Sequence, residues 1–361
     1  MIKKSLCGFL FICGLAAQAV CHASPSPTHF SEGVSATAAI VMDASSERIL
    51  YAKNPNLKLR PASTTKLMTV MVAMDRLKPE TVVKISDHAA ETPSVSPRIR
   101  AGETYTVRDL VALALMRSIN GAAIALAEAT AGSEEAFAVL MNRKAAEIGA
   151  DNAKFINASG LPGAGQHVTV FDLAKIMKES LKYPLIVDTI NSRSQTVFSS
   201  SGRKLVLKNT NELLWTESDM LGGKTGYTRE ARHCFVSAAR KGDSILISAV
   251  LGESQRGNLW DDTAKLMVRG DEVLHRRADP VITYSSGSES PVVFATYREK
   301  SSYKKQKKTA AVKGKKGKKR GDKLSKSKAK KPKKQKGVKQ KSKKRSKKKV
   351  TAEAPRPASR S

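Results

Sequence analysis

Three short motifs hold the residues of this chain whose types and spacing could do chemistry. Ser63-Thr-Thr-Lys66 places a hydroxyl and an amine three residues apart, and Ser118-Ile-Asn120 adds a second hydroxyl and an amide. Lys224-Thr225-Gly226 adds a cation and a residue without a side chain. A serine hydroxyl becomes a good nucleophile when a neighbouring base takes its proton. In this order the motifs predict a serine that is acylated during the reaction.

The first motif can supply both the nucleophile and the base. A helix is expected from Ser63 to Leu77, directly after Pro61, so that Ser63 and Lys66 share one face. Lys66 can accept a proton only if it is neutral for part of the time. Partial burial and a nearby cation such as Lys224 would lower its pKa in that direction. The start of the helix would also bring backbone N–H groups close to a developing oxyanion.

The other two motifs can serve the proton and the substrate. Ser118 and Asn120 lie between two helical patterns and are therefore expected on a loop, where Ser118 could relay a proton and Asn120 could hold the lysine of the first motif. Lys224 and Thr225 could bind a carboxylate, and Gly226 would let a substrate lie along a strand edge. Each motif alone is also typical of ordinary turns and surface residues. Their combination favours the functional interpretation.

The elements that must position these motifs follow from apolar periodicity and turn residues. Strands are expected at both ends of the body and helices between them, which predicts an α+β fold with an antiparallel sheet flanked by a helical cluster. Gly149 and Pro184 are expected to stop helices. The expected helices, besides the one at Ser63, are 107–117, 121–130, 134–148, 170–181 and 258–268, and the expected strand pairs are 36–42 with 48–53, 197–198 with 205–207, and 234–239 with 245–251.

The three motifs together resemble those of the penicillin-recognising serine enzymes. More narrowly, the chain is similar to the D-alanyl-D-alanine carboxypeptidase family, peptidase family S11, which are low-molecular-mass penicillin-binding proteins. The resemblance covers roughly residues 30–270. It rests on the segments Tyr51-Ala-Lys-Asn54, Pro61-Ala-Ser-Thr-Thr-Lys-Leu-Met-Thr69, Asn157-Ala-Ser-Gly-Leu161, Asn209-Thr-Asn-Glu-Leu-Leu214 and Gly223-Lys-Thr-Gly-Tyr227.

The resemblance implies a transpeptidase/β-lactamase-like fold and an exported hydrolase that trims peptidoglycan stem peptides and is inhibited by β-lactams. The residues themselves predict no cofactor and no metal, because the six histidines show no metal-binding spacing and no Gly-rich phosphate loop is present. The roles implied for single residues are Ser63 as acyl-ester nucleophile, Lys66 as proton acceptor, Ser118 as a catalytic hydroxyl with Asn120 beside it, Lys224 as binder of the substrate carboxylate with Thr225 and Gly226, and the backbone N–H groups of Ser63 and Tyr227 as oxyanion hole.

Two departures from the family pattern leave alternatives open. Gly121 follows Asn120 where the family usually has Asp or a similar polar residue, so the lip of the cleft is expected to differ. We also expect neither the β-rich second domain nor the anchor helix of the larger carboxypeptidases. Shorter members include endopeptidases that cut the cross-link from D-Ala to diaminopimelate, so the scissile bond stays open. A non-catalytic wall- or polyanion-binding protein and a β-lactamase, which needs a carboxylate to activate a water, are further alternatives.

Residues 1–23 are expected to be a signal peptide. Lys3 and Lys4 precede a short apolar run, and Cys21-His-Ala23 is typical of a cleavage site. An uncleaved membrane anchor is the alternative interpretation, although the run is short for a span. Export to the periplasm or cell envelope follows, and cleavage would leave Cys234 as the sole cysteine, so no internal disulfide is expected.

The C-terminal segment differs sharply in composition from the rest. We expect residues 24–285 to form the penicillin-binding serine peptidase domain, and residues 286–361 to form a linker and a disordered lysine-rich tail. Residues 301–361 hold 28 of the 64 Lys and Arg but only 2 of the 32 Asp and Glu, with few large apolar residues. Such a tail is expected to bind anionic envelope polymers or a membrane surface. A solvated tail without a dedicated partner is the alternative.

Overall fold

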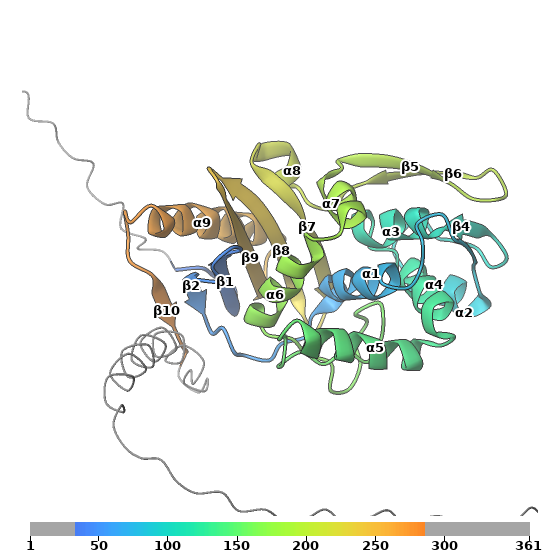
Figure 1. Cartoon of the computed structure of the whole chain (residues 1–361), viewed down its shortest axis with the longest axis horizontal. Helices are drawn as coiled ribbons and strands as arrows, with labels where there is room; N and C mark the ends of the chain where they lie inside the picture. Colours follow the sequence, from blue (N-terminus) through green and yellow to red (C-terminus); the bar gives the residue numbers. More distant parts are fainter. Residues whose placement is uncertain (1–32, 286–361) are drawn as a thin grey trace, which may run out of the picture. The chain divides into compact units, whose positions relative to one another are not determined.

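The computed structural model describes residues 33–285 of the chain (Figure 1). The predicted signal peptide and lysine-rich tail lie outside these residues, so the domain limits at 23 and 285 stay predictions. The strands are β1 Ala38–Asp43, β2 Ile49–Lys53, β3 Val82–Lys84, β4 Thr104–Thr106, β5 Ser194–Phe198, β6 Lys204–Lys208, β7 Met220–Thr228, β8 Arg232–Lys241, β9 Ser244–Glu253 and β10 Val281–Thr283. The helices are α1 Lys66–Met74, α2 Asp87–Glu91, α3 Val107–Met116, α4 Asn120–Ala131, α5 Glu134–Glu147, α6 Val170–Ser180, α7 Pro184–Asn191, α8 Leu213–Thr216 and α9 Arg256–Leu274, with a 3-10 turn, Ala62–Thr65, before α1.

The main sheet joins strands from both ends of the described chain. Its six strands have the order β10-β2-β1-β9-β8-β7, and every neighbouring pair is antiparallel except β10 with β2. The predicted hairpin of 36–42 with 48–53 is confirmed, since Val41 pairs with Tyr51. Strand β7, which carries the third motif, lies at one end of this order. One of its edges is therefore not paired to a strand of the sheet.

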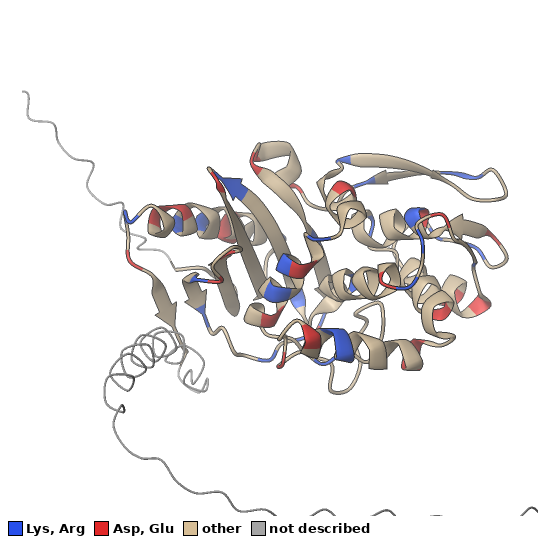
Figure 2. Cartoon of the chain, viewed as in Figure 1, with Lys and Arg blue, Asp and Glu red and all other residues tan. Residues whose placement is uncertain are grey.

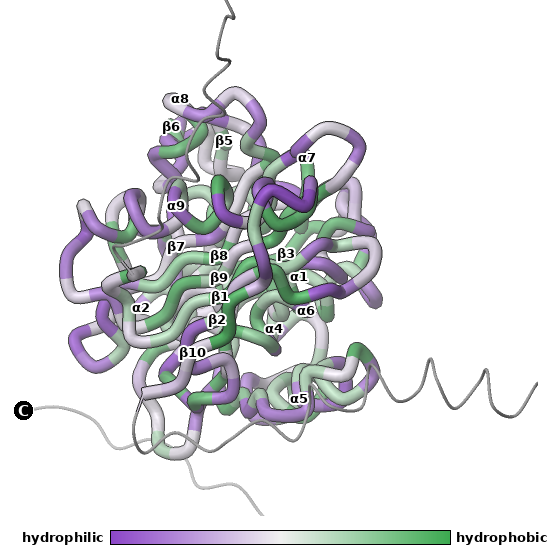
Figure 3. The backbone as a smooth tube through the Cα atoms, turned by 90° about the vertical axis from the view of Figure 1, so that its left-hand side faces the viewer, coloured by the Kyte–Doolittle hydropathy of each residue, from purple (hydrophilic) through white to green (hydrophobic). Residues whose placement is uncertain are grey.

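Alternation along the strands gives the sheet two buried faces. Ile40 and Met42 of β1 face a core shared with helices α1, α3, α4, α5 and α6, whereas Val41 faces a second core shared with α9. Figure 3 shows the hydrophobic central strands β1, β8 and β9 in green. The sheet is therefore covered on both faces, and this confirms the predicted α+β architecture.

The helical cluster surrounds α1, which is apolar over nearly its whole length and buried. Helices α3 and α6 begin with capping boxes, Thr106 with Asp109 and Thr169 with Asp172, in which each side chain bonds the backbone N–H of the other. Gly132, at a φ of 79°, ends α4 in the left-handed conformation that favours glycine. These caps fix where the chain enters and leaves the helices beside the site.

Three sequence-based expectations need correction. The segment at Ser63 begins as a 3-10 turn, and the α-helix runs only from Lys66 to Met74. Pro184 does not simply stop a helix, because it is the first residue of α7, a position where its missing N–H is no loss. The last helix, α9, begins two residues before the predicted range 258–268 and ends six residues after it. The short elements α2, β3, β4 and β10 carried too little periodicity to be expected.

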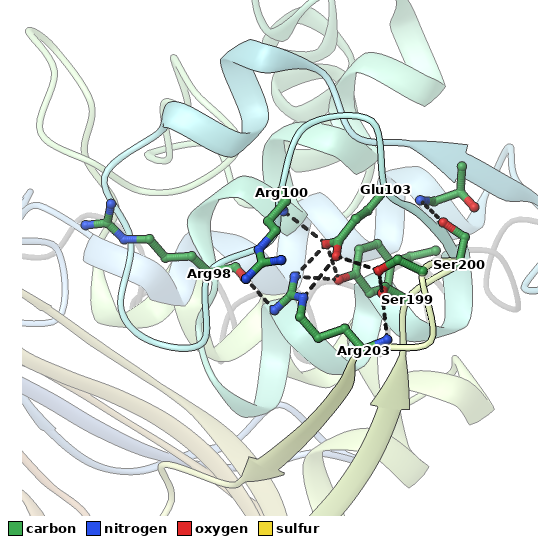
Figure 4. A network of polar contacts seen from close by, with 9 residues as sticks. Arg98, Arg100, Glu103, Ser199, Ser200 and Arg203 are labelled. Carbon is green, nitrogen blue, oxygen red and sulfur yellow. Dashed lines mark hydrogen bonds and ion pairs between the residues drawn. The ribbon is translucent and has the colours of Figure 1, made fainter.

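The hairpin of β5 and β6 is tied to the segment before α3 by a buried ion pair (Figure 4). Arg203 donates from Nε to Oε1 of Glu103 at 2.9 Å and from its terminal nitrogen to Oε2 at 2.5 Å. Tyr105 and Ser201 also donate to this carboxylate, at 2.8 and 3.1 Å. The Glu103 side chain is only 7% exposed. The network thus joins two segments far apart in the sequence.

Charged residues lie mainly on the helices and loops of the described part, and the middles of the central strands carry few (Figure 2). No helix between residues 33 and 285 has the length and apolar character that crossing a membrane requires. Within the same range, no three His, Cys, Asp or Glu side chains gather in a way that could hold a metal ion.

Candidate active site

The structure brings the residues of the first two motifs into direct contact. The Nζ atom of Lys66 donates to Oγ of Ser63 at 2.8 Å and to Oδ1 of Asn120 at 2.6 Å. Its third acceptor is the backbone carbonyl of Ser159, also at 2.6 Å. Ser63 lies in the 3-10 turn and Lys66 begins α1, so their three-residue spacing still places both on one side. The amine is thus held against the hydroxyl from three directions.

Burial favours the neutral form of Lys66. The side chain is fully buried, which lowers its pKa well below the ordinary value for lysine, and the positive charge of Lys224 lowers it further. Glu134 acts in the opposite direction. A neutral amine that already contacts Oγ of Ser63 can accept the hydroxyl proton.

Asn120 is oriented by the loop that follows α2. Its Nδ2 atom donates to the carbonyl of Pro93 at 2.6 Å, and its backbone N–H donates to Oγ of Ser94 at 2.9 Å. These bonds turn Oδ1 towards Lys66. Asn120 is the first residue of α4 and not a loop residue, so the predicted loop covers only the part of the second motif before it.

Ser118 occupies the turn between α3 and α4 in a left-handed conformation, with a φ of 62°. A non-glycine residue in this region is strained by about 1 kcal/mol or more, and such strain gathers at functional sites. The side chain is partly exposed, and its hydroxyl has no hydrogen bond within residues 33–285. Ser118 is therefore available to a substrate, but the structure does not join it directly to Lys66.

The third motif lies in the middle of β7, where the sequence placed it at the start of a strand. Lys224 is fully buried, its Nζ donates to the carbonyl of Thr225 at 2.7 Å, and burial lowers its pKa to about 7. The hydroxyl of Thr225 lies 2.6 Å from that of Thr210. A Cβ at Gly226 would come within 2.9 Å of the backbone nitrogen of Ser63, so only glycine lets β7 pass this close to Ser63.

The remaining predicted residue, Tyr227, follows Gly226 on the outer end of β7. Its side chain is 58% exposed, and its ring lies 4.5 Å from that of His233, the residue opposite it on β8. The tyrosine ring therefore faces solvent beside the motif. Its backbone N–H is the group that the resemblance assigns to the oxyanion hole, and this assignment stays a prediction.

The departure at Gly121 has a physical reason. Helix α4 packs against α2 here, and a Cβ on Gly121 would come within 2.2 Å of the carbonyl oxygen of Ala89. An aspartate cannot be placed at this position unless α2 moves. The close packing of α4 against α2 therefore favours glycine here, and the expected difference at the lip of the cleft stays a prediction.

Sequence reasoning missed the backbone groups of the site. Ser159 belongs to the quoted segment Asn157-Ala-Ser-Gly-Leu161, yet its contribution is a carbonyl, and a carbonyl leaves no residue type to recognise. The same holds for the carbonyl of Pro93. The only available signal was the likeness of that segment to the family, which points to a location and not to a role.

Comparisons with known proteins agree with this geometry. Residues 23–255 match the family described as D-alanyl-D-alanine carboxypeptidase. The chain is 35% identical to the D-alanyl-D-alanine carboxypeptidase DacF of Bacillus subtilis, over 61% of this chain and 58% of that protein. It is 31% identical to the D-alanyl-D-alanine endopeptidase of Escherichia coli, over 70% of this chain and 85% of that protein.

Solved structures place the fold in the same group. The D-alanyl-D-alanine carboxypeptidase of Mycobacterium tuberculosis superposes with a TM-score of 0.62 at 32% identity, over 66% of this chain and 91% of that one. The DD-transpeptidase of Streptomyces gives a TM-score of 0.63 at 27% identity, over 66% and 98%. The fold and the site define a penicillin-binding serine enzyme. Within that class, the chain belongs to the D-alanyl-D-alanine carboxypeptidase family.

Proposed function

We propose that this chain is a serine-type D-Ala-D-Ala carboxypeptidase that trims peptidoglycan stem peptides through an acyl-enzyme on Ser63. The observation that carries the proposal is the fully buried Lys66, whose Nζ lies 2.8 Å from Oγ of Ser63. A scaffold that had lost catalysis would have no need to keep a buried amine against a hydroxyl, which argues against the non-catalytic alternative.

The first half of the proposed reaction forms the acyl-enzyme. Neutral Lys66 takes the hydroxyl proton of Ser63 while Oγ attacks the carbonyl carbon of the penultimate D-Ala. The backbone N–H groups of Ser63 and Tyr227 stabilise the oxyanion. The proton then passes by way of Ser118 to the amine of the terminal D-Ala, which leaves. Water hydrolyses the ester in the second half and restores the free hydroxyl.

Substrate recognition is assigned to β7. The unpaired edge of this strand can align an extended peptide, and Lys224 with Thr225 can bind the terminal carboxylate. Burial of Lys224 makes its ammonium form unfavourable in the free enzyme, and a bound carboxylate would favour that form. β-Lactams are expected to acylate Ser63 in place of the peptide.

A D,D-endopeptidase that cuts peptidoglycan cross-links is the second candidate. It is supported by the relatives named D-alanyl-D-alanine endopeptidase, in Escherichia coli at 31% identity over 85% of that protein and in Pseudomonas aeruginosa at 35% over 75%. Both reactions use the same acyl-enzyme and differ only in the leaving amine.

Location and further partners are proposed from the sequence. The N-terminal signal favours export to the periplasm or cell envelope, where the substrate would be found. The lysine-rich tail favours binding to anionic envelope polymers or a membrane surface, because a dense run of cations binds polyanions.

The test combines covalent labelling with product analysis. We expect a fluorescent penicillin to label the wild-type protein but not Ser63→Ala, and labelling of that variant at equal stoichiometry would exclude Ser63 as the nucleophile. Incubation with a stem pentapeptide and with cross-linked muropeptides, followed by mass spectrometry, then identifies the bond. Release of free D-Ala supports the carboxypeptidase, and conversion of cross-linked dimers to monomers supports the endopeptidase.

A further inference from the structure

The segment that supplies the third acceptor to Lys66 has no regular secondary structure of its own. Residues 157–161 lie between the strand-like bridge at Lys154 and the turn before α6, and the carbonyl of Ser159 within them accepts from Lys66 at 2.6 Å. The position of this carbonyl therefore depends on side chains from other elements. If the segment moved, the amine would lose one of three contacts that aim it at Ser63.

One of the groups that hold this segment is a carboxylate. Oε1 of Glu134 accepts a hydrogen bond from the backbone N–H of Ala158 at 2.7 Å, and Oγ1 of Thr69 donates to the carbonyl of Ala158 at 2.6 Å. Ala158 directly precedes Ser159. Glu134 and Thr69 thus hold the two peptide groups that flank Ala158 by hydrogen bonds. Ala158 is one residue before the carbonyl that contacts Lys66.

Glu134 is mostly buried, and its negative charge acts on Lys66. It is the first residue of α5, its side chain is 19% exposed, and it lines a pocket of about 300 Å³ together with Ser159, Pro93 and His88. The ring of His88, on α2, lies 3.9 Å from Oε2 of Glu134. The pocket thus joins the two segments that supply backbone acceptors, one to Lys66 and one to Asn120.

Charged groups from several elements act on Lys66 and Glu134. Lys66 faces the ammonium of Lys224 from β7, which favours its neutral form, and the carboxylate of Glu134 from α5, which favours its charged form. Glu134 itself faces groups on three elements: His88 on α2, Glu128 on α4 and Glu135 on α5. Burial raises its pKa, whereas the hydrogen bond from Ala158 and the charge of His88 lower it.

We propose that Glu134 is a positioning residue for the general base, which fixes Lys66 through the carbonyl of Ser159 and sets the pH range of acylation through its charge. Within residues 33–285, Nζ of Lys66 contacts a hydroxyl, an amide oxygen and a backbone carbonyl but no carboxylate, so Glu134 acts on it only through the carbonyl of Ser159 and through its charge. This inference rests on the proposed role of Lys66 as the base for Ser63.

The two effects can be separated by substitution. In Glu134→Gln the amide oxygen can still accept from Ala158, so the segment keeps its position while the negative charge is lost. In Glu134→Ala both are lost. Glu135→Gln is the matched control, because it removes the same charge from the next residue of α5, whose side chain faces solvent.

The measurement is the second-order rate of acylation by a penicillin from about pH 5 to 10, with the thermal unfolding midpoint of each variant. Loss of the carboxylate removes a charge that favours the ammonium form of Lys66, so its pKa falls. The base is then neutral at lower pH, and in Glu134→Gln the acid limb of the profile should move to lower pH with a similar plateau. Glu135→Gln should leave the limb in place.

In Glu134→Ala the plateau itself should fall roughly tenfold or more, because small misplacement of a reacting group costs about that much. The proposal requires both results. An unshifted limb in Glu134→Gln overturns it, and so does a wild-type plateau in Glu134→Ala. If Glu134→Ala does not fold, the shift in Glu134→Gln decides alone. Absence of any covalent adduct in the wild-type protein would instead reject the proposed function.

Discussion

Two fully buried lysines are the most unusual single residues of this site. Lys66 contacts Ser63, the proposed nucleophile, and Nζ of Lys224 on β7 donates to a backbone carbonyl. Lysine is rarely buried without a paired acid, because desolvation penalises its charged form. In the proposed mechanism the penalty at Lys66 supplies a neutral amine for proton transfer. At Lys224 it gives a cation that would form most readily when an anionic substrate binds.

The pKa of Lys224 predicts how binding of a peptide with a free carboxylate depends on pH. Burial lowers this pKa to about 7, so the free enzyme carries the charge below that pH and loses it above. Wild-type KM for a peptide with a free terminal carboxylate should therefore rise as pH passes through about 7, whereas KM for its amide-capped analogue should not. In Lys224→Gln the acid substrate should lose roughly tenfold or more in kcat/KM, since a charge-assisted hydrogen bond contributes about 1.5–3 kcal/mol.

Steady-state kinetics with the two peptides across this pH range provide the measurement, and the amide-capped peptide is the control. Equal losses for both peptides in Lys224→Gln would point to a structural role for the lysine and not to carboxylate binding.

At this scale the sequence predicted side chains and missed backbone. Ser63, Lys66 and Asn120 were expected together because their types imply a nucleophile, a base and an amide, and the structure joins them by hydrogen bonds. Ser118 was expected to relay a proton, but it has no direct hydrogen bond to Lys66, so this role stays a prediction. The carbonyl of Ser159 could not be recognised in the sequence, because every residue has a backbone carbonyl.

At the scale of elements, the tip of the β5–β6 hairpin holds the segment that leads into α3. Arg203 bonds Glu103 through two nitrogens and also donates to the carbonyl of Arg98 (Figure 4). The same connection, further towards its start, supplies the groups of Pro93 and Ser94 that orient Asn120. The hairpin thus supports the second motif from a distance, without contributing a side chain to it.

Glu103→Gln should therefore lower stability by about 1–3 kcal/mol, because it leaves the partly buried Arg203 without its counter-charge. The pKa of Glu103 is lowered to about 2 by the hydrogen bonds from Arg203, against an ordinary value of 4.5. A carboxylate whose pKa is lowered in the folded state contributes its full stabilisation at pH values above its pKa in the unfolded state. The difference between wild type and variant should thus be full at neutral pH and vanish as pH falls from about 4.5 to 2.

Thermal unfolding as a function of pH measures this difference. Glu80→Gln is the matched control, because Glu80 pairs with Arg108 at 3.0 Å but both side chains are more than half exposed. Exposed pairs contribute little, so its midpoint should stay close to that of the wild type. The same loss in both variants would mean that burial of the Glu103 pair adds nothing.

Sequence patterns predicted long periodic elements and failed where tertiary contacts decide. Helices α3, α5 and α6 appeared close to their predicted limits, because apolar spacing and caps agree there. Pro184 was misjudged, since a proline that ends one helical pattern can equally begin the next. β10 could not be expected, because its three residues form a strand only by pairing with β2.

At the scale of the whole molecule, the described body carries every predicted catalytic residue, and the lysine-rich tail carries a large share of the positive charge. A truncated chain ending near residue 290 should therefore fold and keep its turnover of a small soluble peptide. It should lose salt-sensitive binding to anionic polymers or anionic vesicles, because that binding depends on release of counterions.

Co-sedimentation at increasing salt, with turnover measured in parallel, makes this comparison. Equal binding of full-length and truncated chains at low salt would leave the tail without a binding role. Loss of small-peptide turnover in a folded truncated chain would place part of the tail in the site.

Cys234 of β8 stands opposite Gly226 of β7, directly behind the strand that is proposed to align the substrate. Its thiol is buried and has its pKa raised to about 12 by burial, so alkylating reagents cannot reach a thiolate while the two strands stay together. The rate of alkylation at this one position, followed by mass spectrometry of its peptide, consequently reports how often this part of the sheet opens. An acyl group bound at the free edge of β7 would slow that opening. The alkylation rate of Cys234 should therefore fall when a ligand is bound.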